Sequence, residues 1–230
     1  MLYYFQSYQE KLQKKNSKNI HLIQEKSLEV SLIFATPATF GLIFLSQEII
    51  MVLFERAFFT SIDTIATSFA LVIFSLGLPA FVCVKIFQVM FFAREDTKSP
   101  MIFAGISVIA NIIISLALFQ YLGYLGIAIS TTVSSWINLL LLYRECTKEK
   151  YFTLNKRLLN RIIKIIVASI GMVFILFIIE KSTPILEFAD GSIVNFLILL
   201  SYVTMGIIFY GIICHLLKIM ELKSFFKFMR

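Results

Sequence analysis

Narrow limits on the fold are set by the stretch from Phe69 to Pro100, which reads FALVIFSLGLPAFVCVKIFQVMFFAREDTKSP. Most of it is apolar enough to lie in a membrane, and it holds one lysine, Lys85, inside the apolar run. It ends in a cluster of opposite charges, after which the next apolar run begins at once. A long helix, a polar turn and a second helix reverse a chain at a bilayer face, so this stretch predicts a polytopic helical membrane protein.

The rest of the chain repeats this pattern. Of its 230 residues, 59% are hydrophobic and 15% are charged, whereas a soluble domain has about half and about a quarter. A helix that crosses the hydrocarbon needs about 20 apolar residues, and barrel strands are shorter and alternate in polarity. We therefore predict an all-α integral membrane protein with about six transmembrane helices. The apolar runs are Glu29–Phe54, Thr64–Phe92, Met101–Tyr121, Gly123–Tyr143, Ile162–Ile179 and Ile193–Leu217.

Within the first run, Pro37 should kink the helix because it lacks an N–H group. That helix is expected to end near Ser46, with Ile49–Phe54 at the membrane interface. Charged residues between the apolar runs divide the chain into five segments. They are a basic N-terminal segment (1–28), a four-helix transmembrane part (29–143), a basic loop (144–161), a C-terminal helix pair (162–217) and a basic tail (218–230).

Lysine and arginine are divided unevenly between the two ends of the predicted helices. Eighteen of the 21 lie in the N-terminal segment, the turn after the second run, residues 144–164 and the tail. Arg56 and Lys181 lie on the opposite side, and Lys85 lies within a span. The positive-inside rule then places both termini in the cytoplasm. We expect the basic segments to attract anionic membrane lipids, with a soluble partner of the loop as the alternative, and we expect no nucleic-acid partner.

Residues typical of catalysis or metal binding form no recognisable pattern. His21 and His215 lie at opposite ends of the chain, and no HExxH motif, glycine-rich phosphate loop or Cys/His metal spacing occurs. The three cysteines are widely spaced and are interpreted as packing residues. We therefore predict that the chain is not an enzyme and has no metal site or cofactor.

Lys85 is the most specific candidate for a functional residue. An ionisable group within a span is costly and tends to face a cavity or a partner. Lys85 precedes Ala93 by eight residues, which corresponds to about 12 Å along a helix from the predicted cytoplasmic face. A lysine stem can also snorkel toward the interface. The sequence leaves both interpretations open.

Polar side chains mark the third and fourth apolar runs. Asn111 and Ser115 are four residues apart and share a helix face, and Thr131 belongs to a Ser/Thr-rich stretch of the fourth run. Close helix packing through small polar residues is the favoured interpretation, and a polar wall or ion site facing an aqueous cavity is the other. The last two runs are almost wholly apolar. They either face lipid or form a groove for a long acyl or isoprenoid chain.

Two consecutive stretches resemble a known family. ATPATFGLIFLSQEIIMVLFERAFFTSIDT and ALVIFSLGLPAFVCVKIFQVMFFAREDTKSP are similar to the second half of the MurJ/MviN-type lipid II flippases of the MOP exporter superfamily. The matching features are the ATPA run, the LFERxxFT…D loop, the GL…K helix and the FFAREDTKSP turn. The similarity continues through Asn111 and GYLGIAISTTVSSWIN. It covers most of residues 28–145 and, more loosely, the last two helices.

The resemblance implies the C-terminal part of a flippase for a lipid-linked peptidoglycan precursor, which acts by alternating access in the bacterial inner membrane. Family members have fourteen helices in two lobes, so this chain resembles half of a two-lobed transporter. The lobe whose arginines hold the substrate's pyrophosphate would lie on a separate chain or be missing. The implied partners are an undecaprenyl-pyrophosphate type lipid and membrane lipids, and the last helix pair would hold the lipid tail. Some members bind an ion through Asn and Asp four residues apart, but Ser115 replaces the acid here.

Two groups of candidate residues follow, and two alternative functions stay open. The alternatives are another MOP-type exporter (an O-antigen flippase or a drug/cation antiporter) and a membrane scaffold or degenerate fragment without transport. An acid inside a span would favour an ion-coupled antiporter, and the sequence offers no convincing one. The candidate substrate or cavity residues are Lys85, Asn111, Ser115 and Thr131, and the candidate turn residues are Arg94, Asp96, Lys98 and Pro100.

Overall fold

All elements of the described structure are α-helices. The computed structural model describes residues 2–182 and 192–219. Most of the predicted basic tail, 218–230, therefore lies outside the described residues. The helices are α1 (Leu2–Phe44), α2 (Ser46–Phe54), α3 (Ser61–Phe92), α4 (Lys98–Leu122), α5 (Tyr124–Lys148), α6 (Lys156–Ser182) and α7 (Ser192–Leu216).

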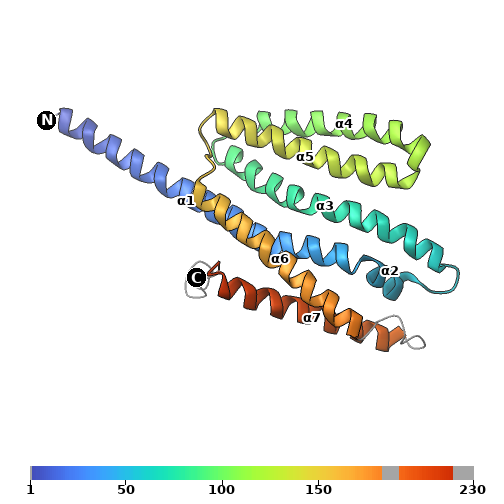
Figure 1. Cartoon of the computed structure of the whole chain (residues 1–230). Coiled ribbons are helices and arrows are strands. Elements are labelled where there is room, and N and C mark those ends of the chain that lie inside the picture. The colour runs from blue at the N-terminus through green and yellow to red at the C-terminus, as the bar shows by residue number, and fades with distance from the viewer. Residues whose placement is uncertain (1, 183–191, 220–230) are drawn as a thin grey trace.

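The long helices lie side by side in the order α4, α5, α3, α1, α6, α7 (Figure 1). α5 packs between α4 and α3, and α1 packs between α3 and α6. Six helices are long and apolar enough to cross a membrane, and the first of these spans is the Leu22–Phe44 part of α1. The predicted six-helix, all-α membrane fold is confirmed. The turn between α3 and α4 and the connection between α5 and α6 lie at the end from which α1 starts (Figure 1).

Helical backbone continues beyond several of the apolar runs. α1 begins at Leu2, although its apolar part was expected from Glu29, and it extends past the bundle in Figure 1. α5 ends at Lys148 and α6 begins at Lys156, so the connection is shorter than the predicted 144–161 loop. Lys, Arg, Glu and Gln favour helix in water. A helix therefore has no reason to end at the last residue of an apolar run, so composition predicts the apolar runs and not the helix ends.

The expected break after the first helix is present. α1 ends at Phe44, and α2 begins at Ser46 as a separate short helix. α2 lies outside the six spanning helices and packs against α3 and α7. Its buried residues include Glu48. The location of Ile49–Phe54 at the membrane interface stays a prediction.

Two hydrophobic clusters hold the helices together. One joins α1, α6 and α7 and is centred on Ile165, Met172 and Leu176. The other joins α3 and α5 to the connection that follows α5, where Phe152 is 2% exposed. The Phe152 ring meets that of Phe87 edge to face, with centroids 5.5 Å apart. The basic connection is therefore anchored on α3 by an aromatic side chain.

Polar side chains on α5 mostly serve helix packing. Thr132 Oγ1 donates a hydrogen bond to the carbonyl oxygen of Ile73 at 2.8 Å, and Trp136 Nε1 donates to that of Leu76 at 3.1 Å. Ser130, Ser134 and Ser135 are buried and donate to carbonyls of their own helix. These contacts agree with the packing interpretation of the Ser/Thr-rich stretch.

Candidate functional site

Lys85 lines a groove between α3 and α1. The groove has a volume of about 460 Å³ and runs along α3 from Lys85 to Ala93, next to the turn that leads into α4. α3 also contributes three apolar residues, and the opposite wall comes from the part of α1 nearest its polar end. The remaining lining residues are Ile23, Gln24, Ser27, Ile86, Val89 and Met90.

The charge of Lys85 has no protein counterion among the described side chains. The ion pairs found there join Lys148 to Glu145 and Arg161 to Glu29. Beside Lys85 in the groove lies Gln24, which is 9% exposed, and its Oε1 atom is buried without a hydrogen-bond partner. A cation and an unsatisfied amide therefore share one cleft between two spanning helices.

The other three candidate cavity residues lie elsewhere. Asn111 and Ser115 are half-buried on α4, and Thr131 is half-buried on α5. Thr131 Oγ1 donates to the carbonyl oxygen of Ile127 in its own helix, 2.9 Å away. The Lys85 groove contains none of these three. Within the described part of the chain, no cluster of three or more His, Cys, Asp or Glu residues that could hold a metal ion is present.

A second, larger groove is almost wholly apolar. It lies between α1, α6 and α7 and has a volume of about 590 Å³. Glycine and alanine line it beside branched and aromatic side chains. α1 supplies much of the lining, whereas the sequence pointed only to the last two helices. The residues are Ile33, Phe34, Pro37, Ala38, Gly41, Leu42, Leu45, Ile49, Met172, Leu176, Tyr202, Val203, Gly206, Ile207, Tyr210 and Gly211.

The turn between α3 and α4 is built by three of its four candidate residues. Arg94 Nη1 donates to the carbonyl oxygen of Met90 at 2.6 Å, and its guanidinium lies 4.2 Å from the Tyr151 ring centroid. Asp96 Oδ1 accepts a hydrogen bond from the Ser99 N–H at 3.0 Å. Pro100 is buried in the first turn of α4, where a missing N–H costs no helical bond. Lys98, the fourth candidate, is exposed.

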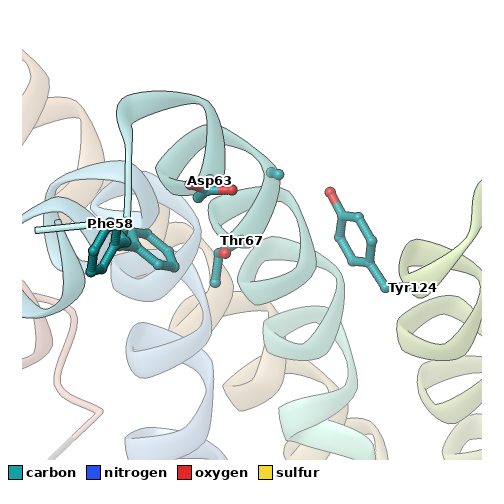
Figure 2. Close-up of a pocket in the computed structure, with 6 residues that line it drawn as sticks. Phe58, Asp63, Thr67 and Tyr124 are labelled. Atoms are coloured by element: carbon teal, nitrogen blue, oxygen red, sulfur yellow. The ribbon is translucent and has the colours of Figure 1, made fainter. Parts of the chain in front are cut away.

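At the opposite end of the bundle, the LFERxxFT…D stretch forms the connection into α3. Asp63 Oδ2 accepts from both the N–H and the Oγ1 of Thr60, and Glu55 Oε2 accepts from Thr64 Oγ1 at 2.6 Å. This connection borders a shallow pocket of about 550 Å³, across which Tyr124 of α5 faces Thr67 of α3 (Figure 2). The motif is therefore explained by loop geometry.

Comparison with known proteins gives these features a context. The sequence model described as "Lipid II flippase MurJ" matches residues 7–197. The chain belongs to this family. A relative from Rhizobium meliloti (strain 1021), named "Probable lipid II flippase MurJ", is 40% identical to this chain over 156 residues. These residues make up 68% of this chain and 29% of that relative. Another of the same name, from Buchnera aphidicola subsp. Acyrthosiphon pisum (strain APS), is 34% identical over 93% of this chain and 42% of that relative.

A solved structure agrees with the MurJ assignment. "Lipid II flippase MurJ, inward closed conformation" matches with a TM-score of 0.72 at 29% identity, over 87% of this chain and 39% of that one. The resemblance seen in the sequence and the membrane-transporter fold are confirmed. The chain spans less than half the length of these MurJ relatives. Their names describe transport rather than catalysis, and a MurJ fold makes this chain a multi-pass membrane protein.

The sequence singled out Lys85 as a candidate but not the α1 residues that line the same groove. Gln24 and Ser27 fall in the segment 1–28, which was interpreted as a polar extension outside the membrane. Their spacing of three residues on one helix face was the available signal. Which helix that face would meet could not be inferred without the tertiary structure.

Proposed function

We propose that this chain acts as the C-terminal part of a lipid II flippase, a transporter and not an enzyme, in the bacterial inner membrane. The observation that carries the proposal is the apolar groove between α1, α6 and α7, in a chain of the MurJ family. A polyprenyl tail needs a continuous apolar surface that is open along its length. The headgroup needs a separate polar path, because unpaired phosphate charge is prohibitively costly in lipid.

A second lobe is part of this proposal. The described helices form one wall, whereas alternating access needs two units that move against each other. Lys85 is the lysine or arginine that lies deepest inside an apolar run of this sequence, and one ammonium binds a pyrophosphate less well than arginines do. We therefore expect the other wall to come from a segment equivalent to the first eight helices of the family.

The orientation that we propose has both chain termini in the cytoplasm. It is supported by the 18-to-2 division of Lys and Arg. Ser61 and Thr153 are exposed at opposite ends of the bundle, and the native cysteines are buried. Cysteine at position 61 should react with an impermeant thiol reagent in intact spheroplasts, and cysteine at position 153 should react only after lysis. The reverse pattern would overturn this orientation.

Transport can be tested by a lipid II accessibility assay in flippase-depleted cells. We expect residues 1–230 to restore flipping only when an eight-helix N-terminal lobe is co-expressed. Val203→Trp should then abolish flipping, because Val203 lines the apolar groove. Ile208→Trp is the matched control, since Ile208 is 60% exposed on the same helix and does not line the groove. Equal activity of the two variants would refute a role of the groove, and flipping by the monomeric chain alone would refute the need for a second lobe.

A further inference from the structure

Lys85 is exposed in the groove, and no acid among the described side chains pairs with it. Lys85 lies about 10 Å along α3 from Phe92, where the helix ends, and a charge within a span is costly unless it is paired or hydrated. Two acids of α1 lie near the groove in sequence: Glu25 is half-buried and does not line it, and Glu29 pairs with Arg161 of α6. Neither ion pair found among the described side chains involves Lys85. An external anion would therefore lower the cost of keeping this lysine in the span.

The neighbours of Lys85 in the groove are suited to the same anion. Gln24 is buried and its amide has an unsatisfied oxygen, and the amide can turn to present its NH₂ group instead. Ser27, three residues further along α1, brings a hydroxyl to the same cleft. An ammonium, an amide and a hydroxyl together offer several hydrogen-bond donors to one small anionic acceptor. A phosphate group fits this donor set better than a carboxylate, because its oxygens are arranged tetrahedrally and can accept from several directions.

The rest of the groove indicates what carries the phosphate. Its other walls are apolar side chains of both helices, such as Ile23, Ile86 and Val89. A volume of about 460 Å³ leaves room beyond a phosphate for the first part of an attached chain. A free, fully hydrated anion would gain nothing from these apolar walls. The ligand is therefore amphipathic.

We propose that Lys85, Gln24 and Ser27 bind the phosphate of a membrane lipid whose chain lies along the α1–α3 groove. Basic clefts between transmembrane helices near one membrane face are a known form of lipid-headgroup site. The inference deepens the proposed function by assigning a phosphate subsite to this half of the flippase. It rests on the proposed function only where the lipid is taken to be the transported precursor.

The full chain, purified in detergent, can be titrated with phosphatidylglycerol and with diacylglycerol, and bound lipid measured by native mass spectrometry. We expect phosphatidylglycerol to bind and diacylglycerol, which lacks the phosphate, to bind at least ten-fold more weakly. Lys85→Met and Gln24→Leu should each weaken phosphatidylglycerol binding by about ten-fold, the effect of one charged or charge-assisted hydrogen bond. Lys26→Met is the matched control, because Lys26 is an exposed lysine of α1 that does not line the groove. It should bind like the wild type.

Three comparisons decide the outcome. Equal affinity of the wild type and Lys85→Met for phosphatidylglycerol would overturn the site. So would a Lys85→Met variant that weakens the binding of phosphatidylglycerol and of diacylglycerol equally. Displacement of phosphatidylglycerol by millimolar inorganic phosphate would overturn the proposal that the bound phosphate belongs to a lipid. Tighter binding of undecaprenyl phosphate than of phosphatidylglycerol supports the precursor as the lipid, and equal binding supports a bulk anionic lipid in the same site. An unchanged unfolding temperature of Gln24→Leu would show that this variant is folded. None of these binding measurements requires lipid II flipping, so the lipid site and the proposed transport function can fail separately.

Discussion

The Tyr210 hydroxyl donates a hydrogen bond to the carbonyl oxygen of Ile33, 2.8 Å away, and this is the carbonyl that Pro37 leaves without a helical donor. In an unbroken helix the N–H of residue 37 would bond to it. Proline has no N–H, so a buried acceptor would remain unsatisfied inside α1. A side chain of α7 replaces the missing donor. The proline therefore specifies where α7 meets α1, at the wall of the apolar groove.

Replacing Tyr210 by Phe should destabilise the protein by about 1 kcal/mol, since the ring stays and only the hydrogen bond is lost. In a Pro37→Ala background the backbone N–H returns to Ile33, so the same Tyr210→Phe change should cost much less. Thermal unfolding of the four proteins in detergent forms a double-mutant cycle. Equal costs in the two backgrounds would show that the hydroxyl does not substitute for the missing backbone donor.

Close approach of α4 and α5 at their hairpin depends on Gly126. A Cβ atom at Gly126 would lie 2.8 Å from the backbone carbonyl carbon of Leu118, too close for any real contact. Gly126→Ala should therefore destabilise the hairpin by about 1–3 kcal/mol through overpacking. Gly105→Ala is the control, because a Cβ there would meet nothing within 4 Å. That change should be neutral or stabilising through helix propensity. Similar unfolding temperatures for the two variants would contradict the close packing.

The sequence predicted the spanning helices well because lipid leaves few choices. An apolar run of sufficient length must be helical in a bilayer, so six helices and the polar turn at Arg94–Pro100 follow from local pattern alone. The basic residues predict only which helix ends face the cytoplasm, since their effect depends on the membrane and not on contacts between helices. The same logic failed at the N-terminal end, where α1 continues as helix through polar sequence. Water permits helix or coil there, and composition does not distinguish them.

The candidate site was predicted only in part because burial by another helix is a tertiary property. Lys85 stands out in any apolar run, but nothing local to α3 indicates that Gln24 of α1 lies beside it. Asn111 and Thr131 have equally suggestive sequence contexts, yet they lie outside the Lys85 groove. Spacing along one helix gives a face, and only the packing of helices gives a site.

Asp96 should make the turn before α4 sensitive to acid. Hydrogen bonds from the side chain and the backbone N–H of Ser99 hold the pKa of Asp96 below its ordinary value. A carboxyl with a lowered pKa stabilises the folded state above its unfolded pKa, and this contribution is lost as the pH falls through the folded value. The turn should therefore weaken only below about pH 4.

The Asp96 carboxyl can be followed by ¹³C NMR of the labelled protein as the pH is lowered. Ser99→Ala should raise its pKa part of the way to the ordinary value, because the hydroxyl is removed while the N–H donor remains. An Asp96 titration that Ser99→Ala leaves unchanged would contradict this account.

Glu48 should lower the stability of the protein at neutral pH. It is 8% exposed on α2, and its Oε2 atom is buried without a hydrogen-bond partner among the described residues. Burial raises the pKa of Glu48, and the nearby carboxylate of Glu180 raises it further. A carboxyl whose pKa is raised by folding binds its proton more tightly in the folded state than in the unfolded state. Stability is therefore greatest below the unfolded pKa of about 4.3 and falls as the pH rises through the folded value.

Glu48→Gln removes the charge and keeps the shape, so it should raise the free energy of unfolding by about 1 kcal/mol or more at pH 8. The gain should vanish near pH 4, where Glu48 is protonated in both states. Glu180→Gln should reduce the gain, because it removes one of the two causes of the raised pKa. Glu149→Gln makes the same chemical change at an exposed position and should have little effect at either pH. The measurement is the unfolding temperature in detergent from pH 4 to pH 8. A Glu48→Gln variant that is no more stable than the wild type at pH 8 would show that the buried carboxylate carries no penalty.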